Sequence, residues 1–237
     1  MKTTVKTKRG FTLVELLVVI VIIASLAGLT APMVIRQRKK ADQTEAINNA
    51  RQIGLGMLEF ENDYGSYPDA ATLTEITASF PTAVITGAAG ADSNGYFKQL
   101  FQAGLTQSEQ MFYAKTRYTK KPDGDISSNA KALEAGEVGF GYILDGVAGL
   151  SSAGNPARAI VATPVSITGA TFDGDPFDRK VVVLRIDNSV TSINIRVPAG
   201  GTNNAGPAIL GGQDLMGASN PIWGGGTPTM KKPLPKL

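Results

Sequence analysis

Residues 10–15 read Gly10-Phe11-Thr12-Leu13-Val14-Glu15, and an apolar run follows them as far as Ile35. Glu15 is the only charged residue between Phe11 and Ile35. As a helix, residues 11–35 would extend about 37 Å, which is enough to cross a hydrocarbon core of about 30 Å. The pattern therefore predicts a membrane-spanning helix. A carboxylate at the edge of such a helix is costly in lipid, so Glu15 needs a functional explanation.

The residues before this stretch carry the chain's excess of positive charge. Residues 1–10 hold four of the 23 Lys and Arg and none of the 20 Asp and Glu. Without them, 19 cations would face 20 anions, so the remaining chain is close to neutral. No basic stripe with interleaved aromatic residues is left, and we therefore expect no nucleic-acid binding.

The missing residue types restrict the chemistry that the chain can perform. Its 237 residues suit one sizeable domain plus an anchor. The chain has no Cys, which excludes disulfides, and no His, which excludes Ser-His-Asp and Cys-His catalysis and removes the commonest zinc ligand. We therefore predict a protein that is not an enzyme and needs no cofactor.

Two simple explanations of the N-terminal segment are a secretory signal peptide and an uncleaved single-pass anchor. The basic start and the small residues near Ala24 fit a signal peptide. However, a signal peptide has no use for Glu15, and the helical pattern continues well beyond the apolar run. Charge does not decide the orientation, because four cations at residues 36–40 balance the four of the leader.

The processing site of type IV prepilins and type II secretion pseudopilins resembles residues 8–15, which have a basic leader, Gly-Phe and a Glu before the apolar run. The resemblance implies that prepilin peptidase cuts between Gly10 and Phe11 and that Phe11 is N-methylated. Glu15 would be the fifth residue of the mature chain, and Pro32 would match a proline that often kinks the helix. In this family, the fifth-residue carboxylate pairs with the N-terminal amine of a neighbouring subunit.

The resemblance also implies a function and a location. It predicts a structural subunit of a pilus or pseudopilus, anchored in the cytoplasmic membrane with its globular domain on the outer side, or exposed on the cell surface if it is assembled into a pilus. Its partners would be copies of itself, other pilin-like subunits and an assembly platform. Residues 64–68 resemble the turn after the helix in major pseudopilins, and the absence of Cys also favours that branch. The alternative is an anchored binding module or adhesin that uses the same processing motif.

Beyond the membrane segment, the helical pattern becomes amphipathic. Apolar residues recur every three or four positions from Ile47 to Tyr64, and Gly65 and Pro68 predict the helix end. We therefore expect a leader at 1–10, a transmembrane and assembly segment at 11–35, a globular domain at 36–226 and a flexible tail at 227–237.

The globular domain is predicted to be α+β. Short helices are expected at residues 69–80, 96–101 and 129–135, and a short turn of helix is expected after a capping box formed by Thr106 and Glu109. Alternation predicts four strands, at residues 138–144, 158–163, 180–186 and 190–197, with a hairpin turn at 187–189. These would form a roughly four-stranded antiparallel sheet that packs on the long helix, the layout that the resemblance also implies.

Two further features are candidate sites. Asp173, Asp175 and Asp178 cluster in one loop, and their carboxylates suit calcium, although the spacing is not that of an EF-hand. Trp223 is the only Trp and lies among glycines; it either folds back onto the domain or contacts a neighbouring subunit.

Overall fold

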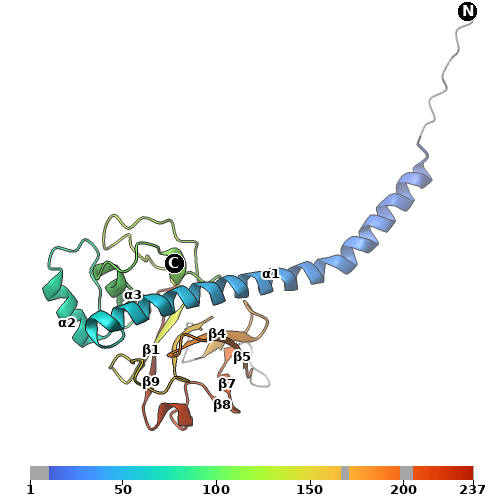
Figure 1. The fold of residues 1–237 in the computed structure, drawn as a ribbon. Coiled ribbons are helices and arrows are strands. Elements are labelled where there is room, and N and C mark those ends of the chain that lie inside the picture. The colour runs from blue at the N-terminus through green and yellow to red at the C-terminus, as the bar shows by residue number, and fades with distance from the viewer. Residues whose placement is uncertain (1–10, 167–170, 198–204, 237) are drawn as a thin grey trace, which may run out of the picture. The chain divides into compact units, whose positions relative to one another are not determined.

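The computed structural model describes residues 11–166, 171–197 and 205–236. The chain forms two compact units, residues 1–38 and residues 39–237, which we describe separately. Helix α1 (Leu13–Tyr64) contributes to both units (Figure 1). The predicted leader, including Gly10, lies outside the described residues.

The part of α1 in the second unit has one buried face, as its periodicity predicts. The buried side chains recur every three or four residues and are Ala46, Ala50, Ile53, Met57 and Phe60. At the end of the helix, Gly65 has a φ of +78° and its N–H donates to the carbonyl of Glu61 at 2.7 Å. A left-handed glycine after the last turn ends the helix at Tyr64.

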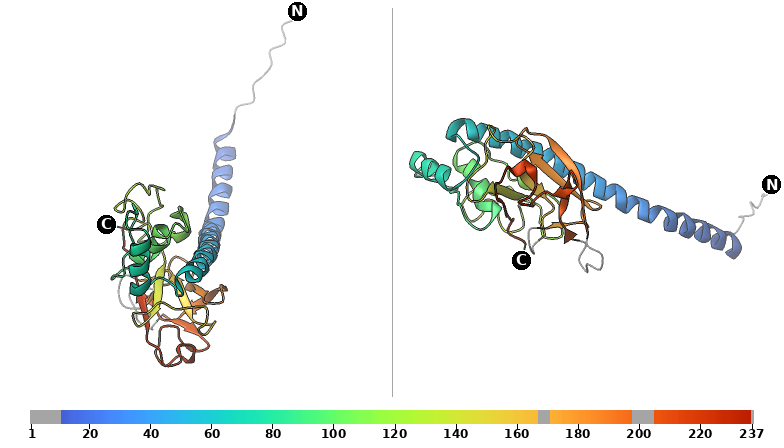
Figure 2. Two further views of the ribbon diagram at one scale, coloured as in Figure 1. Left: turned by 60° about the vertical axis from the view of Figure 1, so that its left-hand side comes forward. Right: turned by 90° about the horizontal axis from the view of Figure 1, so that it is seen from below.

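A seven-stranded antiparallel sheet faces this helix, with the strand order β8-β7-β5-β4-β2-β1-β9 (Figures 1 and 2). A second, two-stranded sheet pairs β3 with β6. The strands are β1 (Gly141–Asp145), β2 (Ala159–Thr163), β3 (Phe172–Asp173), β4 (Lys180–Arg185), β5 (Val190–Ile195), β6 (Ala205–Gly206), β7 (Ala208–Leu210), β8 (Gln213–Asp214) and β9 (Pro228–Lys231).

The predicted α+β architecture is confirmed, and the four predicted strands are β1, β2, β4 and β5. The sheet is wider than predicted because β7, β8 and β9 extend it on both sides. The turn between β4 and β5 lies against α1. A Cβ on Gly54 would lie 2.0 Å from the side-chain oxygen of Asn188 and 3.0 Å from Leu184 Cδ1, so a glycine lets helix and hairpin approach closely.

Two of the short helices are confirmed. Helix α2 (Ala70–Ser79) begins after Asp69, whose carboxylate accepts the N–H of Ala71 at 2.8 Å and of Thr72 at 2.9 Å. Helix α3 (Ser93–Gln102) packs against α2, and Thr72 Oγ1 donates to Gln99 Oε1 at 3.0 Å across that contact.

The short helical turn predicted after Thr106 is confirmed, and the helix predicted at residues 129–135 is wrong. The turn is a single 3₁₀ turn, η1 (Gln110–Phe112), which forms without the predicted side-chain cap. Glu109 does not cap it because its carboxylate accepts the distant N–H groups of Gly124 and Leu133. Residues 129–135 form turns, and Leu133 has a φ of +47°, which an α-helix does not accommodate.

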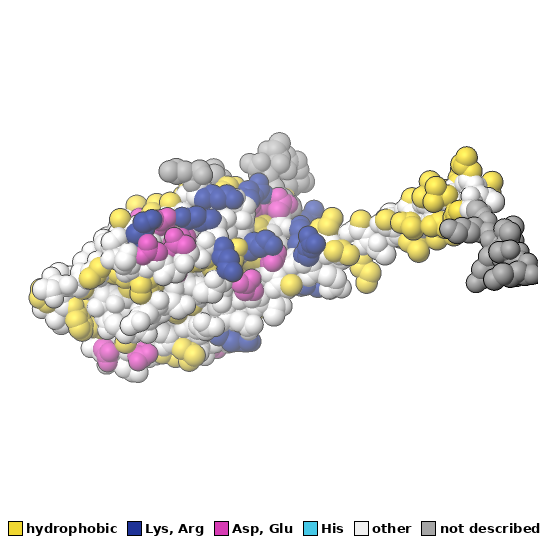
Figure 3. All heavy atoms as spheres, turned by 90° about the horizontal axis from the view of Figure 1, so that it is seen from above, with side chains coloured by type: hydrophobic (Ala, Val, Ile, Leu, Met, Phe, Trp, Pro, Cys, Tyr) yellow, Lys and Arg dark blue, Asp and Glu magenta, His cyan; other side chains and the backbone are white. Residues whose placement is uncertain are grey.

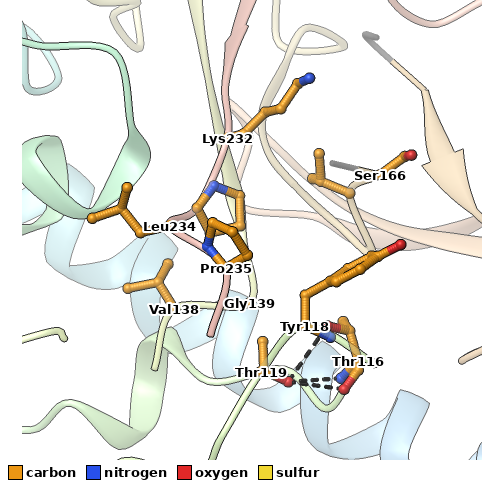
Figure 4. Close-up of a pocket in the computed structure, with 11 residues that line it drawn as sticks. Thr116, Tyr118, Thr119, Val138, Gly139, Ser166, Lys232, Leu234 and Pro235 are labelled. Atoms are coloured by element: carbon orange, nitrogen blue, oxygen red, sulfur yellow. Dashed lines mark hydrogen bonds between the residues drawn. The ribbon is translucent and has the colours of Figure 1, made fainter. Parts of the chain in front are cut away.

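The prediction of a flexible tail at residues 227–237 is also wrong for most of that segment. Strand β9 pairs with β1, which would otherwise expose an unpaired edge to solvent. Beyond it, Leu234 and Lys236 are held by backbone bonds to Gly136 and Tyr118. Figure 4 shows Leu234 and Pro235 beside Val138, and the hollow between them has a volume of about 10 Å³, room for about one water molecule.

Candidate functional site

The first turn of α1 is closed by reciprocal hydrogen bonds between Thr12 and Glu15. The backbone N–H of Thr12 donates to Glu15 Oε2 at 2.9 Å, and Thr12 Oγ1 donates to the same oxygen at 2.7 Å. The N–H of Glu15 in turn lies 3.2 Å from Thr12 Oγ1. This is a capping box, in which two otherwise unpaired helix N–H groups find acceptors.

Thr12 is a site residue outside those predicted from the sequence. Its signal was present, because a Thr three residues before a Glu at the start of an apolar run is the sequence pattern of a capping box. The structure thus gives Glu15 a defined position, at the N-terminal end of a helix whose dipole favours a negative charge there.

The rest of the first unit presents apolar side chains on every side of the helix. The large hydrophobic side chains from Leu13 to Ile35 are all exposed in the single chain. The two hydroxyl groups in this segment are satisfied within the helix, since Ser25 donates to the carbonyl of Val21 at 2.8 Å and Thr30 to that of Leu26 at 3.0 Å. By length and composition, α1 can cross a membrane.

The predicted processing and assembly residues occupy different places on this helix. Phe11, which is 76% exposed, precedes the turn that holds Thr12 and Glu15. Pro32 lies within α1, which runs on through it to Tyr64. Pro32 lies 17 positions after Glu15, or about 25 Å along the helix, so the two cannot act on the same group.

The three carboxylates proposed as a calcium site do not form one. Asp173 is buried, and its carboxylate is paired with the guanidinium of Arg117. Arg117 Nε lies 2.7 Å from Asp173 Oδ2, and Nη2 donates to Oδ1 at 2.9 Å. The same Nη2 lies 2.6 Å from Asp175 Oδ2. A guanidinium therefore already neutralises two of the three carboxylates, and Asp178 is exposed with a φ of +52°. The geometry of this loop does not support a metal site.

Trp223 is part of the core. Its side chain is 0% exposed, and Nε1 donates to the carbonyl of Leu215 at 2.8 Å. The guanidinium of Arg158 lies 5.7 Å from its ring centre. The structure confirms that Trp223 folds back onto its own domain, so this side chain offers no surface to a neighbouring subunit.

The charged side chains of the globular unit are mixed in sign. On the face that Figure 3 shows, Lys and Arg lie interspersed with Asp and Glu. Ion pairs join several of them, including Lys115 with Asp42 at 3.2 Å and Lys120 with Glu134 at 2.5 Å. Among the described residues on this face, the charges form no stripe of a single sign.

Comparison with known families and proteins yields matches of two kinds. Residues 5–31 match the family model described as the prokaryotic N-terminal methylation motif. Similar proteins include the type II secretion system core protein G of Escherichia coli (strain K12), which is 37% identical over 95 residues, and that of Aeromonas hydrophila, which is 33% identical over 93 residues. No solved structure matches the chain.

The matches cover part of each protein. They span 39% of this chain, and 63% and 64% of the two relatives. The core protein G of Pectobacterium carotovorum subsp. carotovorum is 32% identical over 32% of this chain and 48% of that relative. The chain is thus aligned with less than two thirds of the length of these relatives.

Proposed function

We propose that this chain, which carries the prepilin N-terminal methylation motif and is a distant homologue of type II secretion core protein G, is a structural subunit of a membrane-anchored filament. The proposed filament is the pseudopilus of a type II secretion system. The chain is processed by prepilin peptidase between Gly10 and Phe11, N-methylated on Phe11 and assembled through its apolar helix. It has no enzymatic role.

The position of Glu15 carries this proposal. Cleavage before Phe11 creates an ammonium group one residue from Thr12, whose N–H and hydroxyl already bind the Glu15 carboxylate. A lone cation or a lone carboxylate is costly at the membrane face, and a pair of opposite charges is less so. Glu15 can therefore neutralise an N-terminal amine, that of its own chain or that of a neighbour.

The two parts of α1 differ in burial, and this difference supports a subunit that moves from lipid into a filament. The side chains of the first part are exposed in the single chain and need cover, first from lipid and then from other subunits. The second part is already covered by its own sheet through Ile53, Met57 and Phe60. The globular unit can therefore keep its core while the apolar segment exchanges lipid for protein.

The location and partners follow from this proposal. The helix spans the cytoplasmic membrane once, and the globular domain lies on its outer side. The partners are copies of the same chain, other pilin-like subunits, the prepilin peptidase and the assembly platform of a secretion machine. Pro32 lies within the assembly segment, where a proline removes one helix hydrogen bond and allows local bending.

A charge-removing variant tests the proposal. Glu15→Val should be processed and accumulate in the membrane but should fail to form filaments that can be sheared from cells producing the assembly machine. Glu15→Gln keeps an oxygen acceptor for Thr12 but lacks the charge, so it should show the same defect if charge pairing is the cause. Assembly of Glu15→Val at the wild-type level would overturn the proposal.

A further inference from the structure

A short basic segment follows the apolar part of α1 directly. Residues 36–40 contain two Arg and two Lys and begin immediately after Ile35. They lie within α1, whose rise of about 1.5 Å per residue places them about 2–8 Å beyond the end of the apolar segment. The headgroup layer on each side of a bilayer is about 5–7 Å deep. With residues 11–35 in the hydrocarbon core, the four cations therefore lie at the depth of the lipid headgroups.

The four cations point in different directions around the helix. Successive residues of an α-helix are rotated by about 100°, so Arg36, Arg38, Lys39 and Lys40 spread over more than half of its circumference. We call these four side chains the basic collar. Three of them are exposed and Lys39 is half-buried. A protein partner on one side of the helix would meet only some of the collar, whereas lipid headgroups surround a membrane helix.

The positive charge of the basic collar is not neutralised within the described part of the chain. No acidic side chain described there forms an ion pair with any of the four cations. Asp42 follows Arg38 at the spacing that allows pairing along a helix, but its carboxylate lies 3.2 Å from the ammonium of Lys115. The next acid, Glu45, accepts the side-chain amide of Gln110 at 3.2 Å. The collar is therefore available to an anionic partner outside the chain.

A hollow in the globular unit lies beside one of these cations. It has a volume of about 280 Å³, and Lys39, Lys115 and Arg117 are the basic residues that line it. Its two acidic lining residues are already engaged, because Asp42 pairs with Lys115 at 3.2 Å and Asp175 with Arg117 at 2.6 Å. Lys39 has no ion pair among the described residues, so it can meet an anionic group that enters the hollow.

We propose that the basic collar binds the headgroups of anionic phospholipids. Phosphate oxygens accept hydrogen bonds from both Arg and Lys, and each cation close to an anionic membrane surface raises the affinity about five-fold. The choice of leaflet rests on the proposed function, which places the collar on the outer side of the cytoplasmic membrane. Cations on that side do not follow the positive-inside rule, so they are not explained as an orientation signal. Bound headgroups would hold the end of the apolar segment at the membrane face until the subunit leaves the lipid.

The test measures lipid binding by the full chain in micelles of an uncharged detergent. Native mass spectrometry would compare two lipids with the same acyl chains, dioleoyl phosphatidylglycerol, which is anionic, and dioleoyl phosphatidylcholine, which has no net charge. Phosphatidylglycerol should bind about 10-fold more tightly or better, and the difference should shrink at high ionic strength. Equal binding of the two lipids would overturn the proposal.

Matched variants locate the lipid site, because the four cations of residues 1–10 also attract an anionic lipid. Lys40→Gln should weaken phosphatidylglycerol binding about five-fold, and Arg36→Gln combined with Lys40→Gln about 25-fold. Lys40→Arg keeps the charge and should bind like the wild type. Arg51→Gln removes an exposed cation about 16 Å farther along α1 and should also leave binding unchanged. Wild-type binding by the double variant, or an equal loss in Arg51→Gln, would contradict the assignment.

Filament formation by the double variant separates a lipid partner from a protein partner. Wild-type lipid binding together with a loss of filaments would overturn the proposal in favour of a contact with a neighbouring subunit. The lipid measurement needs no assembly machine, so its result is independent of the filament test with Glu15→Val. Failure of lipid binding and failure of the proposed function are therefore distinguishable.

Discussion

Thr12 and Glu15 are joined by reciprocal hydrogen bonds at the first turn of α1. The Glu15 carboxylate accepts the backbone N–H of Thr12, and the Thr12 hydroxyl oxygen accepts the backbone N–H of Glu15. The consequence is that the only carboxylate in the apolar segment has a fixed place before any partner subunit is present. The position of the Glu15 carboxylate therefore depends on the N–H and the hydroxyl of Thr12.

Thr12→Val should fray the start of the helix. The variant loses the hydroxyl that contacts both the carboxylate and the N–H of Glu15, and the loss of such a cap costs about 0.5–2 kcal/mol. Amide hydrogen exchange of Val14 and Glu15, measured by NMR on the chain in bicelles, should become faster. Thr12→Ser retains the hydroxyl and should exchange like the wild type; equal exchange in Thr12→Val would contradict the cap.

A close backbone contact at Gly149 predicts a sensitive position in the globular unit. A Cβ on Gly149 would lie 2.1 Å from the carbonyl oxygen of Tyr67, and the neighbouring Leu150 accepts the N–H of Tyr67 at 2.8 Å. Gly149→Ala should therefore lower the free energy of unfolding by about 1–3 kcal/mol. Gly90→Ala is the control, because a Cβ there would meet nothing within 4 Å.

Chemical denaturation of the two glycine variants would measure this difference. Gly90→Ala should be neutral or slightly stabilising, since alanine restricts the unfolded chain more than glycine does. If Gly149→Ala unfolded at the same denaturant concentration as Gly90→Ala, the contact with Tyr67 would not constrain the fold.

Arg117 is expected to stabilise the domain through Asp173. Arg117→Gln would leave the buried Asp173 carboxylate without its bidentate partner, with a loss of about 1–3 kcal/mol, since the partly exposed arginine reduces the effect of burial. Adding Asp173→Asn should recover part of this loss, because the unpaired charge is then removed. Additive losses in the double variant would show that the two residues do not interact.

Trp223 provides a spectroscopic prediction. A single buried indole should emit at short wavelength and resist quenching by iodide. Because Trp223 packs within its own domain, its emission should stay the same when subunits assemble into filaments. A large change of emission on assembly would place Trp223 at a contact between subunits.

The main elements could be predicted from the sequence where periodicity is long enough to read. The stripe from Ile47 to Tyr64 and the alternation in the strands that became β1, β2, β4 and β5 led to the correct architecture. Strands β7, β8 and β9 have two to four residues, too few for a period of two to be recognised. Their places depend on pairing with residues far away in sequence, such as Tyr142 with Lys231.

The Thr-x-x-Glu pattern of a capping box occurs at residues 12–15 and at residues 106–109, and these two cases differ in a physically informative way. In the first unit, the exposed Glu15 carboxylate accepts hydrogen bonds from the N–H and the hydroxyl of Thr12, and from no other residue that the structure describes. In the second unit, the carboxylate of Glu109 is buried beside the N–H groups of Gly124 and Leu133 and binds these instead of completing a cap. Local sequence shows the pattern but not the tertiary competition for the carboxylate.

The intact mass of the chain, extracted from the membrane of a host with prepilin peptidase, shows whether the chain is processed as a prepilin. We expect a mass reduced by residues 1–10 and increased by one methyl group, with the modification on Phe11. Gly10→Leu, which replaces the residue before the proposed cut, should give the unprocessed mass under the same conditions. A wild-type chain that retains residues 1–10 in that host would contradict the proposed processing and assembly.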